Sequence, residues 1–305
     1  MIRTVLGEIG KEDLQTTMCH EHFIVDLTSV RKDHDSIIET VEEVIPEINK
    51  MQELKVHSAI EVTTIDLKRD VRKLVEISKK TGLNIIASTG FYIRPYHPKY
   101  IDESTAEEIA DLFIKEITEG MDDTGIRAGI IAEIGSTKGF HPEEKKVHRA
   151  AAIAAVKTGA AVSTHTGPNE AMETIDILLK EGMNPDKVII GHQDLVDDTE
   201  HHLKLLKRGV NIAFDTVGKV AYMPDEVRAD NFCELIKQGF EDHILLSNDV
   251  SRRTYFTTYG ELGYTAVMKK FVPMLKERGI SDFVIQKVLS DNPARILDFD
   301  ERDQI

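Results

Sequence analysis

The sequence predicts an α/β fold, a closed (β/α)8 TIM barrel, from three observations. Eight short apolar runs rich in β-branched residues recur along the 305 residues, amphipathic stretches with charged faces separate them, and several runs are nearly continuous in Val, Ile and Ala. Strands that alternate with helices indicate a parallel sheet, and continuous apolar strands are typical of a sheet covered on both faces. Doubly wound sheets share this pattern, but eight such units favour closure, because a closed barrel has no edge strand.

The boundaries of these elements follow from the runs themselves. The predicted strands are 17–24, 58–64, 84–90, 128–134, 160–166, 187–193, 210–216 and 243–249. The clearest helical stretches between them are 102–120, 143–158, 170–182 and 198–208. No internal repeat, low-complexity segment or linker divides the chain, so we expect one domain, residues 1–305.

Composition restricts the class of partner. A net charge of −15 argues against nucleic acid and anionic membranes, which both require a basic surface, and favours a small-molecule substrate. The N-terminus has no signal-peptide pattern and no apolar run is long enough to span a membrane, so we expect a cytoplasmic protein. Cys19 and Cys233 lie too far apart in sequence to suggest a disulfide framework, and Cys19 is expected to be a small buried residue.

Potential metal ligands stand at the ends of five of the eight predicted strands. Because the loops after barrel strands build the active site, residues at these ends should converge. They are His20 and His22 on the first strand, Glu133 on the fourth, His165 on the fifth, His192 on the sixth and Asp249 on the eighth.

Each of these residues also has a structural interpretation. His20 and His22 alternate along a strand and can grip one metal, whereas Glu21 between them points the other way and is expected to be a structural partner. Glu133 could instead form a buried salt bridge, and Asp249 could cap a helix. His165 and His192 could each be ordinary core or loop histidines, and their shared position at strand ends favours the metal site. The other histidines are expected at the surface: His34, His57, His97, His141, His148, His201, His202 and His243.

In order and context, these residues resemble the phosphotriesterase family of the amidohydrolase superfamily, essentially from end to end. The segments "HEHFIVDL", "AGIIAEIG", "STHTG", "GHQDL", "FDTVGK" and "LLSNDVSRR" resemble the branch of phosphotriesterase homology proteins. The resemblance implies two divalent metal ions, usually zinc, with His20, His22 and Asp249 on the more buried ion and His165 and His192 on the more exposed one. A side chain and a hydroxide would bridge them. Manganese, cobalt and nickel accept the same ligands.

The sequence departs from the best-known members of the family at the bridge. Those members carry a carboxylated lysine, whereas this chain has Glu133, which already supplies two oxygens. Lys138 is expected in the following loop and not as a bridge. The substitution makes phosphotriester hydrolysis a poor prediction but preserves the metal chemistry.

The predicted reaction is hydrolysis by the bridging hydroxide, with Asp249 as the catalytic residue that accepts its proton. We expect lactone opening, with a phosphorylated sugar lactone as one candidate substrate; N-acyl amide and phosphoester hydrolysis are alternatives. A Schiff-base aldolase or isomerase would need a lysine at the end of an inner strand, which no run has. A non-catalytic metal-dependent binding protein is the remaining alternative.

Residues in the loops are predicted to bind the substrate. Four cations could form a cationic cluster for an anionic group, although solvent exposure explains each one equally well: Arg94, Lys219, Arg252 and Arg253. Tyr92 could hydrogen-bond a carbonyl or leaving-group oxygen, as a tyrosine near this position does in lactonase relatives. Those relatives are often dimers, so a homodimer is one option for the assembly.

Overall fold

Eight parallel strands form the wall of a nearly closed barrel in the computed structural model, which describes residues 1–299. Every predicted run overlaps one strand, and the order of the strands around the barrel follows their order in the chain. The last six residues of the predicted 1–305 domain lie outside the described residues. The barrel strands are β3 (Thr17–Glu21), β6 (Ser58–Glu61), β7 (Asn84–Thr89), β8 (Ile130–Ser136), β9 (Val162–Thr166), β10 (Val188–Ile190), β11 (Asn211–Phe214) and β12 (Ile244–Leu246).

The seam between the last strand and the first is closed by polar contacts. Asp249 N donates to His20 O at 3.1 Å, and His20 N donates to Ser247 Oγ at 2.9 Å. The buried Glu21 carboxylate accepts from Ser247 Oγ at 2.8 Å and from the backbone N–H of Asn248 at 2.9 Å. Glu21 is therefore a structural partner, as predicted.

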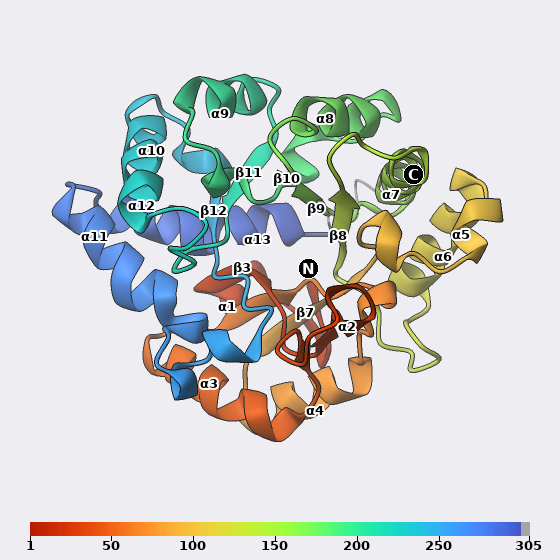
Figure 1. Ribbon diagram of the computed structural model, residues 1–305, viewed down its shortest axis with the longest axis horizontal. Coiled ribbons are helices and arrows are strands. Elements are labelled where there is room, and N and C mark those ends of the chain that lie inside the picture. Colours follow the sequence, from red (N-terminus) through yellow and green to blue (C-terminus); the bar gives the residue numbers. More distant parts are fainter. Residues whose placement is uncertain (300–305) are drawn as a thin grey trace.

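Helices surround the strands (Figure 1) and cover the outer face of the barrel. Side-chain caps fix where helices begin, as at the start of α3. There Thr40 Oγ1 accepts a hydrogen bond from Glu43 N, and the Glu43 carboxylate accepts one from Thr40 N, which together form a capping box. None of the helices within residues 1–299 is long and apolar enough to cross a membrane. The main helices are α3 (Val41–Glu53), α4 (Val71–Thr81), α6 (Ala106–Thr118), α7 (Pro142–Thr158), α8 (Ala171–Lys180), α9 (Thr199–Leu206), α10 (Asp225–Lys237), α11 (Val272–Glu277), α12 (Asp282–Gln286) and α13 (Asn292–Leu297).

The predicted single helix over 102–120 is wrong. The chain forms α5 (Tyr100–Glu103), breaks, and starts again as α6. The break occurs because Thr105 adopts an extended backbone and caps the new helix, its Oγ1 accepting from Glu108 N.

Short elements outside the barrel were not predicted. The antiparallel pair β1 (Ile2–Thr4) and β2 (Gly7–Ile9) precedes α1 (Lys11–Leu14). A second antiparallel pair, β4 (Val25–Asp26) and β5 (Ile37–Ile38), lies in the loop after β3 and encloses the short helix α2 (Thr28–Arg31) in sequence. This loop brings α2 to the functional end of the barrel.

Two histidines predicted at the surface are buried. His148 and His202 expose none of their surface, because their rings pack inside the helical layer and each ring makes a hydrogen bond to a backbone carbonyl, of Glu144 and Gln193 respectively. Burial lowers the pKa of both to about 4, so both are neutral at pH 7. Of the eight, His34 is exposed and the other five are partly buried.

Candidate metal centre

The six predicted ligands lie within five barrel strands or no more than three residues after them. His20 and His165 lie within β3 and β9, and His22 directly follows β3. The predicted strand-end positions need correction for the others: Glu133 lies in the middle of β8, whereas His192 and Asp249 lie in the loops after β10 and β12.

Left-handed backbone turns aim two of these side chains. His192 has a φ of 58° and Asp249 a φ of 48°, a region that non-glycine residues rarely adopt. Next to His192, a Cβ on Gly191 would lie 2.1 Å from Thr164 O, so only glycine permits this approach to β9. At His192 and Asp249 the backbone thus departs from the extended strand conformation, and this departure directs both side chains.

Potential ligand atoms converge on the Glu133 carboxylate. Its Oε1 lies 2.7 Å from His165 Nδ1, 3.3 Å from His20 Nε2 and 3.3 Å from His192 Nε2. Its Oε2 lies 3.7 Å from His22 Nε2. Both oxygens of this carboxylate therefore face histidine nitrogens and are available to bind a metal ion.

Two overlapping sets could each hold a metal ion. Their ligand atoms lie within 4.8 Å of one another, and the sets are His20, His22 and Asp249, and His20, Glu133 and His192. Asp249 Oδ1 lies 3.4 Å from His22 Nε2. His165 belongs to neither set and reaches the centre through its contact with Glu133.

The donor chemistry fits a divalent transition metal. His20 Nε2 is buried and, among residues 1–299, has no hydrogen-bond partner, although it faces the carboxylates of Glu133 and Asp249. A buried nitrogen without a donor or acceptor is costly unless a ligand satisfies it. Imidazole and carboxylate together suit zinc and its neighbours in the first transition series.

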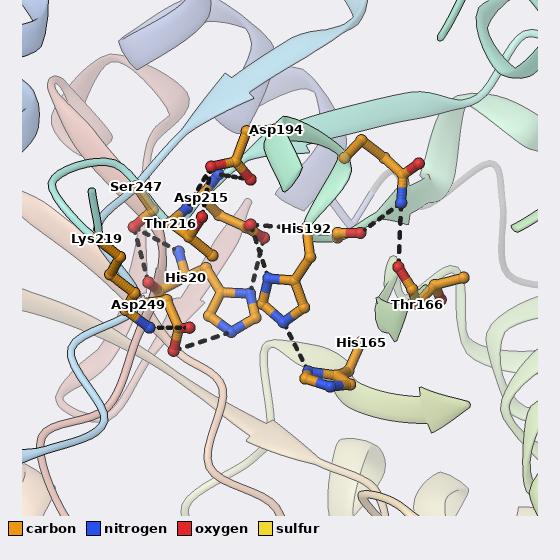
Figure 2. A network of polar contacts seen from close by, with 12 residues as sticks. His20, His165, Thr166, His192, Asp194, Asp215, Thr216, Lys219, Ser247 and Asp249 are labelled. Atoms are coloured by element: carbon orange, nitrogen blue, oxygen red, sulfur yellow. Dashed lines mark hydrogen bonds and ion pairs between the residues drawn. The ribbon is translucent and has the colours of Figure 1, made fainter. Parts of the chain in front are cut away.

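Asp215 orients two of these histidines and was missed by sequence reasoning. Its Oδ1 lies 2.9 Å from His192 Nδ1, and its Oδ2 lies 3.2 Å from His20 Nδ1 (Figure 2). Burial alone would lower the pKa of His192, but the Asp215 carboxylate outweighs it and raises that pKa to about 10. The signal was an aspartate near the end of the predicted seventh strand, at the same level of the barrel as the ligands.

A second supporting chain reaches His22. Its Nδ1 lies 2.8 Å from Thr63 Oγ1, which in turn donates to Glu61 Oε1 at 2.6 Å. Both Thr63 and Glu61 are fully buried. Both residues fall within the predicted run 58–64, but Thr63 lies beyond the end of β6, and the sequence offered no signal for the contact.

A cavity of about 30 Å³ opens over the centre. Tyr92 lines it, with its hydroxyl 3.2 Å from His165 Nε2. Asp249 lines it too, and its second oxygen is paired with Lys219, which lines a neighbouring cavity of about 200 Å³ between the loops after β11 and β12. Arg31, which was not predicted, also lines the cavity over the centre.

The other predicted cations are engaged away from this cavity. Arg94 Nε lies 3.0 Å from Glu143, and Arg253 Nε lies 2.7 Å from Glu43. Arg252 lies 3.4 Å from the carboxylates of Asp33 and Asp35. The structure therefore brings Tyr92, Lys219 and Asp249 to the centre and pairs the three arginines with acidic residues around it.

Comparison with known proteins assigns the chain to a family. The model of the phosphotriesterase family matches residues 1–297. A crystal structure of the phosphotriesterase homology protein from Escherichia coli, complexed with phosphate in its active site, is 32% identical, with a TM-score of 0.91 over 94% of this chain and 99% of that chain.

Relatives with named activities match at similar levels. The phospho-furanose lactonase of Mycoplasmopsis synoviae is 33% identical, over 98% of this chain and 92% of the relative. The N-acetyltaurine hydrolase of Salmo salar is 29% identical, over 98% of each chain. This chain therefore belongs to the phosphotriesterase family and is a hydrolytic enzyme.

Proposed function

We propose that this enzyme opens a lactone ring at a binuclear metal centre held by His20, His22, Glu133, His165, His192 and Asp249. The observation that carries the proposal is the position of the Glu133 carboxylate, which faces four histidines with its two oxygens. Zinc is the metal we expect first. When bound, two such ions supply a hydroxide nucleophile at neutral pH and polarise the carbonyl oxygen of the substrate.

Asp249 is proposed as the proton acceptor. Burial alone would raise the pKa of its carboxyl, but the Lys219 ammonium and the neighbouring histidines hold that pKa far below its usual range. Asp249 therefore enters the reaction ionised. After the carbonyl carbon is attacked, it can take the proton of the attacking oxygen and pass it to the ring oxygen that leaves.

Tyr92 is proposed to position the substrate. Burial raises the pKa of its phenol well above the usual value, so the hydroxyl stays protonated and can donate. From its place beside His165, that hydroxyl can bind the carbonyl or the leaving ring oxygen.

The preferred substrate is a lactone that carries an anionic group, such as a phosphorylated sugar lactone. Lys219 lines the cavity of about 200 Å³ beside the centre and brings a positive charge there, although its ammonium is paired with Asp249. The similarity to a phospho-furanose lactonase supports this choice. N-acyl amide hydrolysis is the second candidate, supported by the N-acetyltaurine hydrolases, because attack on either carbonyl needs the same groups.

The test combines elemental analysis with a substrate screen. We expect about two divalent ions per chain, and turnover of phosphorylated sugar lactones above turnover of N-acyl amino acids and phosphoesters. Light scattering on the same sample would decide between a monomer and a homodimer. A folded protein that binds no metal when supplied with excess zinc or manganese would refute the centre, and turnover of amides alone would replace the lactone with the second candidate.

A further inference from the structure

Arg31 has a position that the proposed reaction does not yet use. It is the last residue of α2, in the loop after β3, and it lines the cavity over the metal centre together with His22, Tyr92, Glu133 and Asp249. No other lysine or arginine of the described residues lines this cavity. Arg31 is thus the cation that lines the cavity over the centre, whereas Lys219 contacts Asp249 from the neighbouring cavity.

Its guanidinium differs from the neighbouring cations in having no acidic partner. Arg94, Arg252 and Arg253 each pair with carboxylates, and Lys219 pairs with Asp249. Within residues 1–299, no carboxylate lies within ion-pair distance of Arg31, whose polar contact is with the Tyr96 hydroxyl. A guanidinium has five N–H donors, so most of its donors stay available.

The positive charge of Arg31 acts on a group inside the cavity. Burial raises the pKa of the Tyr92 phenol and the Glu133 carboxylate raises it further, while Arg31 acts in the opposite direction. Arg31 is therefore close enough to influence a group that we place beside the substrate.

The surroundings explain why an anion would bind here. The protein as a whole carries a net charge of −15, which repels anions from most of its surface. An anionic substituent that extends beyond the metal ligands therefore needs a local cation at the place where it binds. The planar fork of an arginine matches the two oxygens of a phosphate or carboxylate.

We propose that Arg31 is a specificity-determining residue that binds the oxyanion substituent, phosphate or carboxylate, of the substrate at the mouth of the metal centre. The inference rests on the proposed function for the identity of the scissile bond. It places the anion on the side of α2, whereas Lys219 approaches the centre from the loop after β11.

The experiment compares matched substrates on metal-loaded enzyme. A phosphorylated furanose lactone is paired with its unphosphorylated form, and an N-acyl amino acid with the corresponding N-acyl amine. We expect Arg31→Gln to lower kcat/KM for the anionic member about 10- to 100-fold, the range of a charge-assisted contact, with less than about a threefold change for the neutral member. The pair that shows the loss identifies the anion.

Two variants control for structure and charge. Lys32→Gln removes the adjacent exposed cation and should leave the ratio of anionic to neutral substrate unchanged. Arg31→Lys keeps the charge without the fork and should recover part of the loss. Equal losses on both members of each pair, or the same loss of ratio in Lys32→Gln, would overturn the role of Arg31.

A binding measurement separates this inference from the proposed reaction. Should the wild-type enzyme hydrolyse none of these carbonyl substrates, the proposed function fails, and calorimetric titration with a pentose 5-phosphate still tests Arg31. We expect Arg31→Gln to raise the dissociation constant at least about tenfold. An unchanged constant would overturn the inference.

Discussion

Replacing Asp215 by asparagine should weaken metal binding while keeping the fold. The carboxylate holds Nδ1–H of His192 at 2.9 Å and faces Nδ1 of His20 at 3.2 Å, which leaves both Nε2 atoms free to bind a metal. Asparagine has nearly the same shape, but its amide nitrogen can only donate. Placed toward His20, it would favour the tautomer whose proton sits on Nε2, the atom that a metal needs.

The magnitude follows from these two contacts. Loss of one outer partner of a ligating histidine typically costs about 10- to 100-fold in metal affinity, or about 1.4 to 2.7 kcal/mol. Because His20 belongs to both candidate ligand sets, both metal positions should weaken. A loss of at least about tenfold at each position is expected.

Competition with a chromophoric chelator measures this loss. Circular dichroism should show an unchanged fold, and Asp176→Asn, which removes a surface charge paired with Arg208, serves as the matched control. Wild-type metal affinity in a folded Asp215→Asn protein would show that Asp215 does not set the histidine tautomers, and would refute the reasoning.

Three further predictions concern the bridge, a buried network and pH. Glu133→Ala should lose metal and activity together. An active variant with its full metal content would contradict the proposed role of Glu133 as the bridging ligand. Arg228→Leu should lower the free energy of unfolding by about 3–5 kcal/mol, because it leaves the buried carboxylate of Asp194 unpaired; a loss below about 1 kcal/mol in chemical denaturation would contradict this. The pKa of His148 is about 4 in the folded protein and about 6.5 in the unfolded chain, so between pH 7 and pH 5 the unfolded state binds more protons. The free energy of unfolding should therefore fall by about 2 kcal/mol from pH 7 to pH 5. His148→Gln should lack this part of the loss. Identical pH profiles for both proteins would exclude the histidine as the cause.

The network around Arg228 explains why its replacement should be costly. Its guanidinium, fully buried, donates to Asp194 Oδ2 at 2.7 Å, to Asp225 Oδ1 at 3.0 Å and to Thr216 Oγ1 at 2.9 Å. It thereby joins α10 to the loop after β11, the loop that carries Asp215 and Lys219. A loss of stability in Arg228→Leu should therefore come with a disturbed metal site.

The sequence predicted the barrel well because its evidence was repetitive. Eight apolar runs separated by helical stretches give the same information many times, and an error at one boundary, such as the break at Thr105, leaves the topology intact. The convergence of the six candidate ligands was predictable for a related reason, since polar residues in or just after apolar strands are conspicuous.

Contacts between distant residues could not be predicted in this way. The support of His22 by Thr63 and Glu61 depends on the register between neighbouring strands, and the aim of His192 and Asp249 depends on left-handed backbone turns. Arg31 was missed because it lies in a loop whose path is set by the short strands β4 and β5. A charged residue in a loop follows no helical or strand periodicity in the sequence. Its neighbours can therefore be identified only from the three-dimensional path of the loop.

The seam between β3 and β12 has a consequence for how metal and folding are linked. His20 and Ser247, which meet across it, are separated by 227 residues of chain, and the proposed ligands His20, His22 and Asp249 straddle the same junction. Joining such remote segments costs loop-closure entropy that shorter contacts avoid, and an ion gripping both sides would offset that cost. The metal would then hold the first and last strands of the barrel together. Its removal should first loosen the junction between β3 and β12, while the other six strands stay packed.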